Sequence, residues 1–297
     1  MFESLLVLGI TTNVIERISL ADGSVRTVVA DTGPAPDGLV VDARGGRIYW
    51  TTMGQARSES DFDAADGSIR SARLDGSDQR TIVPTGSLTT GKQLAADFTT
   101  ARLYWGDREG CRVSRVDMDG TGLTDLVINA PTADRTAECV GVAVDPAQGY
   151  LYWTQKGPAK GGRGRILRAG LEIPLGETAA ARTDIEVLWD GLPEPIDLHL
   201  DPATATLYWT DRGAGPDGNT LNRAAVPRKG LRGDAPQILA RNFTEAIGLA
   251  VDTDAGLAYV TDLGGTVRAV PLDPGSGATE FVVARFEGRP LTGIAGL

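Results

Sequence analysis

The hydrophobic and polar positions of this chain repeat with a period of about fifty residues. In each repeat a short apolar segment ends in an aspartate, and seven residues later a tyrosine stands in an aromatic, β-branched segment. The five pairs are Asp42–Tyr49, Asp97–Tyr104, Asp145–Tyr152, Asp201–Tyr208 and Asp252–Tyr259. Successive aspartates stand 55, 48, 56 and 51 positions apart. This spacing is typical of propeller blades and related β repeats.

One repeat, residues 37–86, predicts four short strands joined by tight turns. DGLVVD is apolar, GRIYWTT is aromatic and β-branched, GSIRSARLDG alternates and ends in an Asp-Gly turn, and QRTIVPTG supplies the fourth strand. A meander of four short strands cannot bury its own faces. Neighbouring copies must therefore cover them, as they do in a propeller.

The two ends of the chain complement each other. Complete repeats occupy residues 37–86, 90–130, 138–190, 194–241 and 245–285. The first 30 residues match the second to fourth strands of a repeat, and the last nine, RPLTGIAGL, match the first strand. We therefore expect an all-β fold over residues 1–297 as a single domain. The expected architecture is a six-bladed β-propeller of four-stranded antiparallel blades, with the last blade closed by both termini.

Composition narrows the class of protein. A hydrophobic content of 41% is enough for a buried core, and no apolar run approaches the roughly eighteen residues of a membrane span. The net charge of −10 argues against nucleic acid and anionic lipid as partners. The start, MFESLLVLGI, lacks the basic region of a signal peptide, and Cys111 and Cys139 form no disulfide framework. These features favour a cytoplasmic protein.

The YWT(D) strand, the preceding P-x-G-L-x-V-D and the following Leu-Asp-Gly turn recur together. This combination resembles the low-density-lipoprotein-receptor class B, or YWTD, repeat over essentially the whole chain. The resemblance implies a six-bladed propeller, and many members of that family are extracellular modules that bind proteins. The chain is also similar in architecture to gluconolactonase-like and strictosidine-synthase-like propellers, which are small-molecule enzymes working at the central channel.

The residue seven positions before each repeat aspartate is expected to ring the mouth of the channel. These residues are Ala35, Thr90, Glu138, Glu194 and Glu245, with Arg289 in the closing blade. Carboxylates from three adjacent blades, facing the Arg289 guanidinium, could bind a divalent cation, calcium or magnesium, with Glu138, Glu194 and Glu245 as ligands. They could instead supply an acid/base pair. A third interpretation is structural, with each glutamate bonded to a neighbouring blade.

The segment EPIDLHLD, residues 194–201, breaks the repeat pattern. Where other blades carry mostly glycine and then alanine or valine, this one has Asp197 and His199, and His199 is the single histidine of the chain. Two residues apart on a strand, both project to one side, about 7 Å apart. With Glu194 they are the candidate catalytic residues, since Asp197 could orient His199 as a base. The alternative is a buried histidine bonded to Asp197 or to the backbone.

Substrate-binding candidates surround the same opening. Gln93 breaks the pattern at the level of Asp197, and Asp37 and Lys92 stand at equivalent places in two adjacent blades, where they could pair across the rim. Arg289 completes this set. Long loops follow the aromatic strands at 53–67, 155–164 and 211–219. The first is acidic at Glu59, Asp61 and Asp63, and the second is basic at Lys156, Lys160 and Arg163.

Together these residues favour an enzyme that acts on a small polar or anionic organic molecule at the channel mouth. Acid/base or metal-assisted chemistry of a hydrolase (lactonase-like) or a lyase or cyclase fits the residues, with no cofactor or a divalent cation. No GxGxxG follows a strand, so neither a nucleotide cofactor nor redox chemistry is expected. The alternative is a non-catalytic propeller that binds a protein or peptide through its loop face. Met53 and Phe62 are the large apolar residues of those loops, which favours a small ligand.

Overall fold

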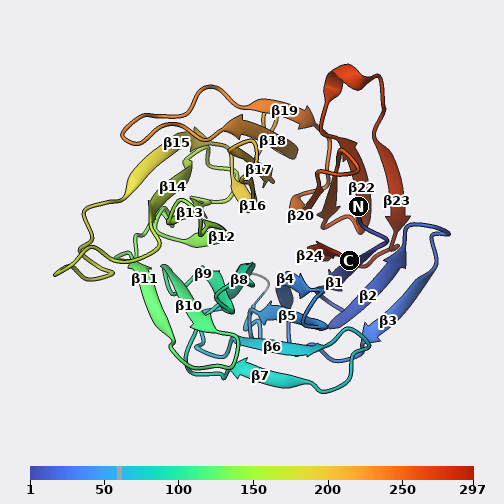
Figure 1. The fold of residues 1–297 in the computed structure, drawn as a ribbon, viewed down its shortest axis with the longest axis horizontal. Coiled ribbons are helices and arrows are strands. Elements are labelled where there is room, and N and C mark those ends of the chain that lie inside the picture. Colours follow the sequence, from blue (N-terminus) through green and yellow to red (C-terminus); the bar gives the residue numbers. More distant parts are fainter. Residues whose placement is uncertain (59–61) are drawn as a thin grey trace.

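The computed structural model describes residues 1–58 and 62–297, which form six four-stranded antiparallel sheets arranged as a ring (Figure 1). The predicted six-bladed propeller is therefore confirmed. Glu59 and Asp61 of the acidic loop lie outside the described residues. Within the described residues, no helix is long and apolar enough to cross a bilayer.

Each blade runs from an inner strand at the axis to an outer strand at the rim. Blade I, from both termini, contains β24 (Leu291–Gly296), β1 (Ser4–Gly9), β2 (Val14–Ser19) and β3 (Val25–Val29). Blade II contains β4 (Pro36–Asp42), β5 (Arg47–Thr52), β6 (Ser68–Arg73) and β7 (Arg80–Val83). Blade III contains β8 (Gly91–Asp97), β9 (Arg102–Asp107), β10 (Arg112–Asp117) and β11 (Thr124–Ile128).

The remaining blades follow the same order. Blade IV contains β12 (Cys139–Asp145), β13 (Tyr150–Gln155), β14 (Gly164–Gly170) and β15 (Glu186–Leu192). Blade V contains β16 (Pro195–Asp201), β17 (Thr206–Asp211), β18 (Thr220–Ala225) and β19 (Gln237–Ala240). Blade VI contains β20 (Ala246–Asp252), β21 (Leu257–Asp262), β22 (Thr266–Pro271) and β23 (Phe281–Arg285), with the short 3₁₀ helix η1 (Pro274–Ser276) before β23.

The repeat aspartate ends the inner strand and caps the turn to the second strand. The carboxylate of Asp42 accepts the N–H of Gly45 at 2.7 Å, and that of Asp145 accepts the N–H of Gln148 at 3.0 Å. Aspartate suits such turns because its short side chain reaches backbone N–H groups a few residues ahead. The fixed length of this capped turn explains the constant seven-residue interval to the tyrosine.

The aromatic strand supplies both core and cap. Its tryptophans, Trp50, Trp105, Trp153 and Trp209, are fully buried. The aspartate that ends β9, Asp107, accepts the N–H of Thr90 at 2.7 Å, and Asp211 of β17 accepts the N–H of Glu194 at 3.0 Å. The final aspartate of the YWTD motif thus fixes the backbone just before the inner strand of its own blade.

The threonine of the same motif joins neighbouring blades. The hydroxyl of Thr154 accepts the N–H of Gly141 at 2.7 Å and donates to the carbonyl of Ile196, in the next blade, at 2.8 Å. Thr51, Thr210 and Thr261 make the same pair of bonds in their blades. Blade III has Gly106 instead, where a Cβ would lie 2.5 Å from the Val140 carbonyl oxygen. There the glycine allows the closer approach of two blades.

Removing one bridging hydroxyl is expected to weaken the ring. In Thr154→Val the shape is kept but the N–H of Gly141 and the carbonyl of Ile196 lose their partner, at a cost of about 1–3 kcal/mol of unfolding free energy. Thr154→Ser keeps the hydroxyl and is expected to lose clearly less. Urea unfolding measures both, with Thr178→Val at an exposed position as the control. Equal stability of the valine and serine variants would contradict the role of the bridge.

Candidate functional site

The inner strands β4, β8, β12, β16, β20 and β24 surround the axial channel (Figure 1). We call the end where they begin the strand-start mouth and the other end the strand-end mouth. A cavity of about 430 Å³ occupies the half toward the strand-end mouth. Each inner strand contributes apolar side chains to its lining, among them Leu39, Ala95, Val142, Leu198, Leu249 and Ile294. Phe2 and Phe98 lie at the rim of this cavity.

Asp197 and His199 both line the cavity, together with Gln93. The two oxygens of Asp197 accept the N–H groups of Leu198 and Leu249, each at 2.8 Å. Burial raises the pKa of Asp197 to about 7, against the effect of these two bonds. Asp197 therefore joins the inner strands of blades V and VI. Within the described residues it makes no hydrogen bond to His199, so the predicted orienting bond is not seen.

His199 lies inside the channel with part of its ring exposed to the cavity. The ring meets the ring of Tyr208 edge-on, with centroids 6.4 Å apart. Burial lowers the pKa of His199 to about 4, although the Asp201 carboxylate acts in the opposite direction. At neutral pH the imidazole is therefore uncharged, so it can both donate and accept a hydrogen bond.

Lys92, Gln93 and Asp37 form a contact between blades II and III. Gln93 donates from Nε2 to Oδ1 of the fully buried Asp37 at 2.9 Å, and the Lys92 ammonium pairs with the other carboxylate oxygen. Lys92 Nζ also lies 3.2 Å from Sδ of Met53. The predicted pairing of Asp37 with Lys92 across the rim is thus present. Gln93 also lines the cavity, so this contact reaches the cavity wall.

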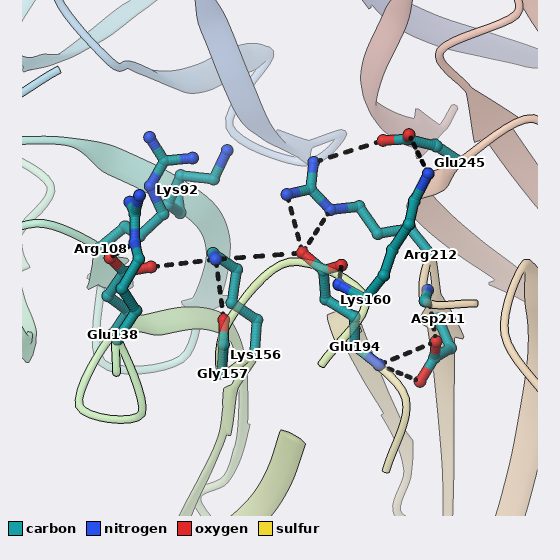
Figure 2. A network of polar contacts seen from close by, with 12 residues as sticks. Lys92, Arg108, Glu138, Lys156, Gly157, Lys160, Glu194, Asp211, Arg212 and Glu245 are labelled. Atoms are coloured by element: carbon teal, nitrogen blue, oxygen red, sulfur yellow. Dashed lines mark hydrogen bonds and ion pairs between the residues drawn. The ribbon is translucent and has the colours of Figure 1, made fainter. Parts of the chain in front are cut away.

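The three glutamates of the strand-start mouth are paired with basic residues (Figure 2). Lys156 Nζ lies 3.1 Å from Glu138 Oε2 and 3.9 Å from Glu194 Oε1. Arg212 Nη2 lies 2.8 Å from Glu194 Oε1, and Lys160 Nζ lies 3.3 Å from Glu245 Oε1. The Glu138–Lys156 and Glu194–Arg212 pairs lie within one blade, whereas Lys156 also reaches Glu194, and Glu245 of blade VI pairs with Lys160 of blade IV. The structural interpretation, a bond to another blade, therefore fits Glu194 and Glu245.

The proposed cation ligands Glu138, Glu194 and Glu245 do not form a ligand set. Among the described residues, no three histidine, cysteine, aspartate or glutamate side chains gather closely enough to hold a metal ion. Each glutamate already has a cationic partner, whereas calcium and magnesium need several oxygen ligands directed at one point. The donor set therefore does not fit the calcium or magnesium site considered from the sequence.

Arg289 also differs from expectation. Its guanidinium contacts both oxygens of Glu16, at 3.2 and 3.1 Å, and packs over the ring of Phe286. The arginine therefore bonds within its own blade rather than facing the three glutamates. Glu16 lies on β2 of the same blade, and the repeat pattern did not single it out.

The candidate catalytic residues lie at two levels of the channel. Glu194 precedes β16 and belongs to the strand-start mouth, whereas His199 lies five residues further along the strand, about 16 Å away by strand rise.

Burial raises the pKa of the Cys111 thiol to about 11 and raises that of Cys139 as well. Neither cysteine therefore provides a thiolate nucleophile.

Arg108 and Arg212 were missed from the sequence, and Lys156 was considered there as part of the basic loop 155–164. Arg108, Lys156 and Arg212 each occupy the first position after the second strand of three consecutive blades. The signal was present in the aligned segments YWGDR, YWTQK and YWTDR. Lys156 and Arg108 are buried, and Arg212 is largely so.

Asp197 and His199 have shifted pKa values and should change the stability of the fold in opposite directions as the pH changes. The folded state keeps a proton on Asp197 to about pH 7, whereas the unfolded chain releases it near 3.8, so this contribution falls as pH rises between those values. The folded state releases the His199 proton at about pH 4 instead of 6.5, so this contribution falls as pH drops between those values.

Relative to the parent protein, Asp197→Asn should therefore gain about 1–3 kcal/mol as pH rises from 4 to 7. His199→Gln should gain stability as pH falls from 6.5 to 4. Urea unfolding at unit pH intervals measures both slopes. Curves that run parallel to the parent curve would show that neither group has a shifted pKa.

The chain is similar in sequence to known proteins along most of its length. No family model matches the chain. It is 44% identical over 274 residues to a "Low-density lipoprotein receptor-related protein 1" of Pyricularia oryzae, covering 88% of this chain and 86% of the relative. It is 41% identical over 284 residues to "3-hydroxyacyl-CoA dehydrogenase-like protein LAM1" of Cochliobolus heterostrophus, covering 91% of this chain but 58% of that relative's length.

Solved structures show the same fold at low identity. The propeller of a nidogen/laminin complex aligns with a TM-score of 0.71 at 20% identity, covering 98% of this chain and 97% of that chain. A putative 6-phosphogluconolactonase of Bacteroides uniformis aligns with a TM-score of 0.58 at 15% identity, covering 97% and 82%. The relative from Pyricularia oryzae is matched along most of both chains, and this match shows the family. The chain belongs to the low-density-lipoprotein-receptor-related proteins, with YWTD repeats as its blades.

Proposed function

We propose that this propeller is an enzyme that binds a small polar or anionic organic molecule in the axial cavity and acts on it by acid/base chemistry. One observation carries the proposal: blade V places Asp197 and His199 where other blades have mostly glycine, and alanine or valine, and both side chains line the 430 Å³ cavity. This volume is in the range of small-molecule sites, which combine an apolar lining with a few polar groups.

The two groups have complementary protonation states. With a pKa of about 7, Asp197 is present both as acid and as carboxylate near neutral pH, which suits a general acid/base. His199 is neutral and can hold a substrate oxygen by a hydrogen bond. The apolar lining strengthens these interactions because it keeps the local dielectric constant low. Glu194 is not part of this pair because it lies at the strand-start mouth.

Hydrolysis of a lactone-like ester fits this pair. The Asp197 carboxylate takes a proton from water as the water oxygen bonds to the carbonyl carbon. It returns that proton to the ring oxygen as the carbon–oxygen bond breaks, leaving a hydroxy acid. An elimination or cyclisation that needs proton transfer alone also fits. None of these reactions requires a nucleotide.

Turnover of small lactones tests the proposal. We expect the parent protein to hydrolyse members of a panel of aldonolactones. The hydroxy acid that forms releases a proton, and this release is the measured signal. Asp197→Asn and His199→Ala should lower kcat/KM by about 10²-fold or more, because each removes a group that acts on the reacting atoms. Glu280→Gln, at the exposed rim, is the control.

Thermal unfolding must show that the variants are folded. Full activity in folded Asp197→Asn and His199→Ala would remove the cavity from consideration. Absence of both turnover and ligand-induced stabilisation across the panel would argue against a lactone substrate.

The family favours a second candidate, in which the loop face binds a protein partner. The relative from Pyricularia oryzae is named as a receptor-related protein, and a chain of a nidogen/laminin complex has the same fold. Met53 and Phe62 are buried here, so a partner would meet charged side chains such as Lys160, which is 54% exposed. Partner capture should then fall on Lys160→Glu and be unchanged in His199→Ala, which separates the two candidates.

A further inference from the structure

Arg108 is a buried cation with unused donors. Its side chain is 10% exposed and lies over the ring of Phe62. Its Nε donates to Glu109 Oε1 at 2.6 Å. Its terminal nitrogens Nη1 and Nη2 have no acceptor within the part of the chain that the structure describes. A guanidinium carries four of its five N–H donors on these two atoms. Neither atom is among the fully buried polar atoms that lack a partner, so both are open to solvent and can meet a ligand at this mouth.

Lys92 is a second buried cation in the same neighbourhood. It is 8% exposed and has Asp37 as its ionic partner. Burial lowers the pKa of Lys92 well below its usual value, and the charges of Arg108 and Arg212 lower it further. Figure 2 shows its side chain beside that of Arg108. Lys92 therefore lies at this mouth close to other cations, in addition to its own partner Asp37.

Basic residues of several blades meet at this mouth, where they alternate with carboxylates. Three of the four lysines of the sequence, Lys92, Lys156 and Lys160, belong to it. Arg108, Lys156 and Arg212 come from the same repeat position of blades III, IV and V, so the propeller symmetry directs them toward one axis. Lys156 and Arg212 share the Oε1 atom of Glu194, at 3.9 and 2.8 Å.

We propose that Arg108 and Lys92, supported by Lys156 and Arg212, bind an oxyanion at the strand-start mouth: the phosphate or carboxylate group of a small molecule. A guanidinium with two free terminal nitrogens matches two oxygens of such a group, and a lysine beside it adds a point charge. Three glutamates hold Arg108, Lys156 and Arg212 in place, and Asp37 holds Lys92. The site lies at the other end of the channel from Asp197 and His199 and does not rest on their proposed activity.

Calorimetric titration with inorganic phosphate, and separately with malonate, tests the site at constant ionic strength, with chloride as the reference anion. We expect saturable binding of phosphate, malonate or both, and at least tenfold weaker binding in Arg108→Gln. The control is Arg163→Gln, which changes an exposed arginine of the same face that pairs with Asp134. This variant should bind both probes with the affinity of the parent protein. Binding by one probe alone would identify that oxyanion as the preferred chemistry.

Three results would overturn the proposal: no saturable binding of either probe, the same response to chloride, or parent-like affinity in Arg108→Gln. Should Arg108→Gln fail to fold, Arg108→Lys keeps the charge and the stem but loses the two-pronged geometry. We expect that variant to bind severalfold more weakly, and unchanged affinity would again overturn the site. His199→Ala should bind both probes normally, so failure of the cavity chemistry and failure of this site are distinguishable.

Discussion

The hydroxyl bridge of the YWTD threonine is the interaction on which the channel depends. In the part of the chain that the structure describes, strand pairing stays within each blade, so the hydroxyls of Thr51, Thr154 and Thr210 are direct polar links between neighbouring blades. The glycines beside these bridges reflect the same closeness, because a Cβ at Gly141 would lie 2.1 Å from the Ile196 carbonyl oxygen. Blade V departs from this rule. There Asp197 replaces the glycine, and its carboxylate spans to Leu249 of blade VI. The same substitution that introduces a titratable group into the cavity also supplies an inter-blade link.

The two ends of the channel have different chemistry. The half toward the strand-end mouth is apolar, with Gln93, Asp197 and His199 as polar groups. The strand-start mouth is crossed by alternating acids and bases from blades III to VI. Buried ion pairs of this kind stabilise little by themselves, since both partners lose hydration, but breaking one leaves a costly unpaired charge. The network therefore constrains which residues can vary at this mouth more than it raises the stability of the fold.

The sequence predicted the architecture because each blade repeats local rules: a capped turn after the aspartate, a buried aromatic strand and a threonine at a fixed place. The closing blade was predicted as well, because the last residues of the chain match the first strand that the N-terminal blade lacks, and they form β24 beside β1. Side-chain partners were harder to predict. Asp37 and Lys92 were paired correctly because they occupy adjacent blades, but Arg289 reached Glu16 instead of the glutamates. Two of the cations that pair with those glutamates, Lys156 and Arg212, lie one position beyond the aromatic strand, and this shared position was not recognised from the sequence. Long charged side chains choose among several partners in space, and a period of fifty residues does not specify that choice.

The closing blade places the start of the chain next to the cavity. The N–H of Phe2 bonds to Asp252 of blade VI at 2.6 Å, its ring forms part of the cavity rim, and β1 begins two residues later beside β24. A molecule seated in the cavity thus touches the segment by which the circle is fastened. Its binding energy would be added to the fastening by linkage, so an occupied propeller should resist opening at this seam more than an empty one.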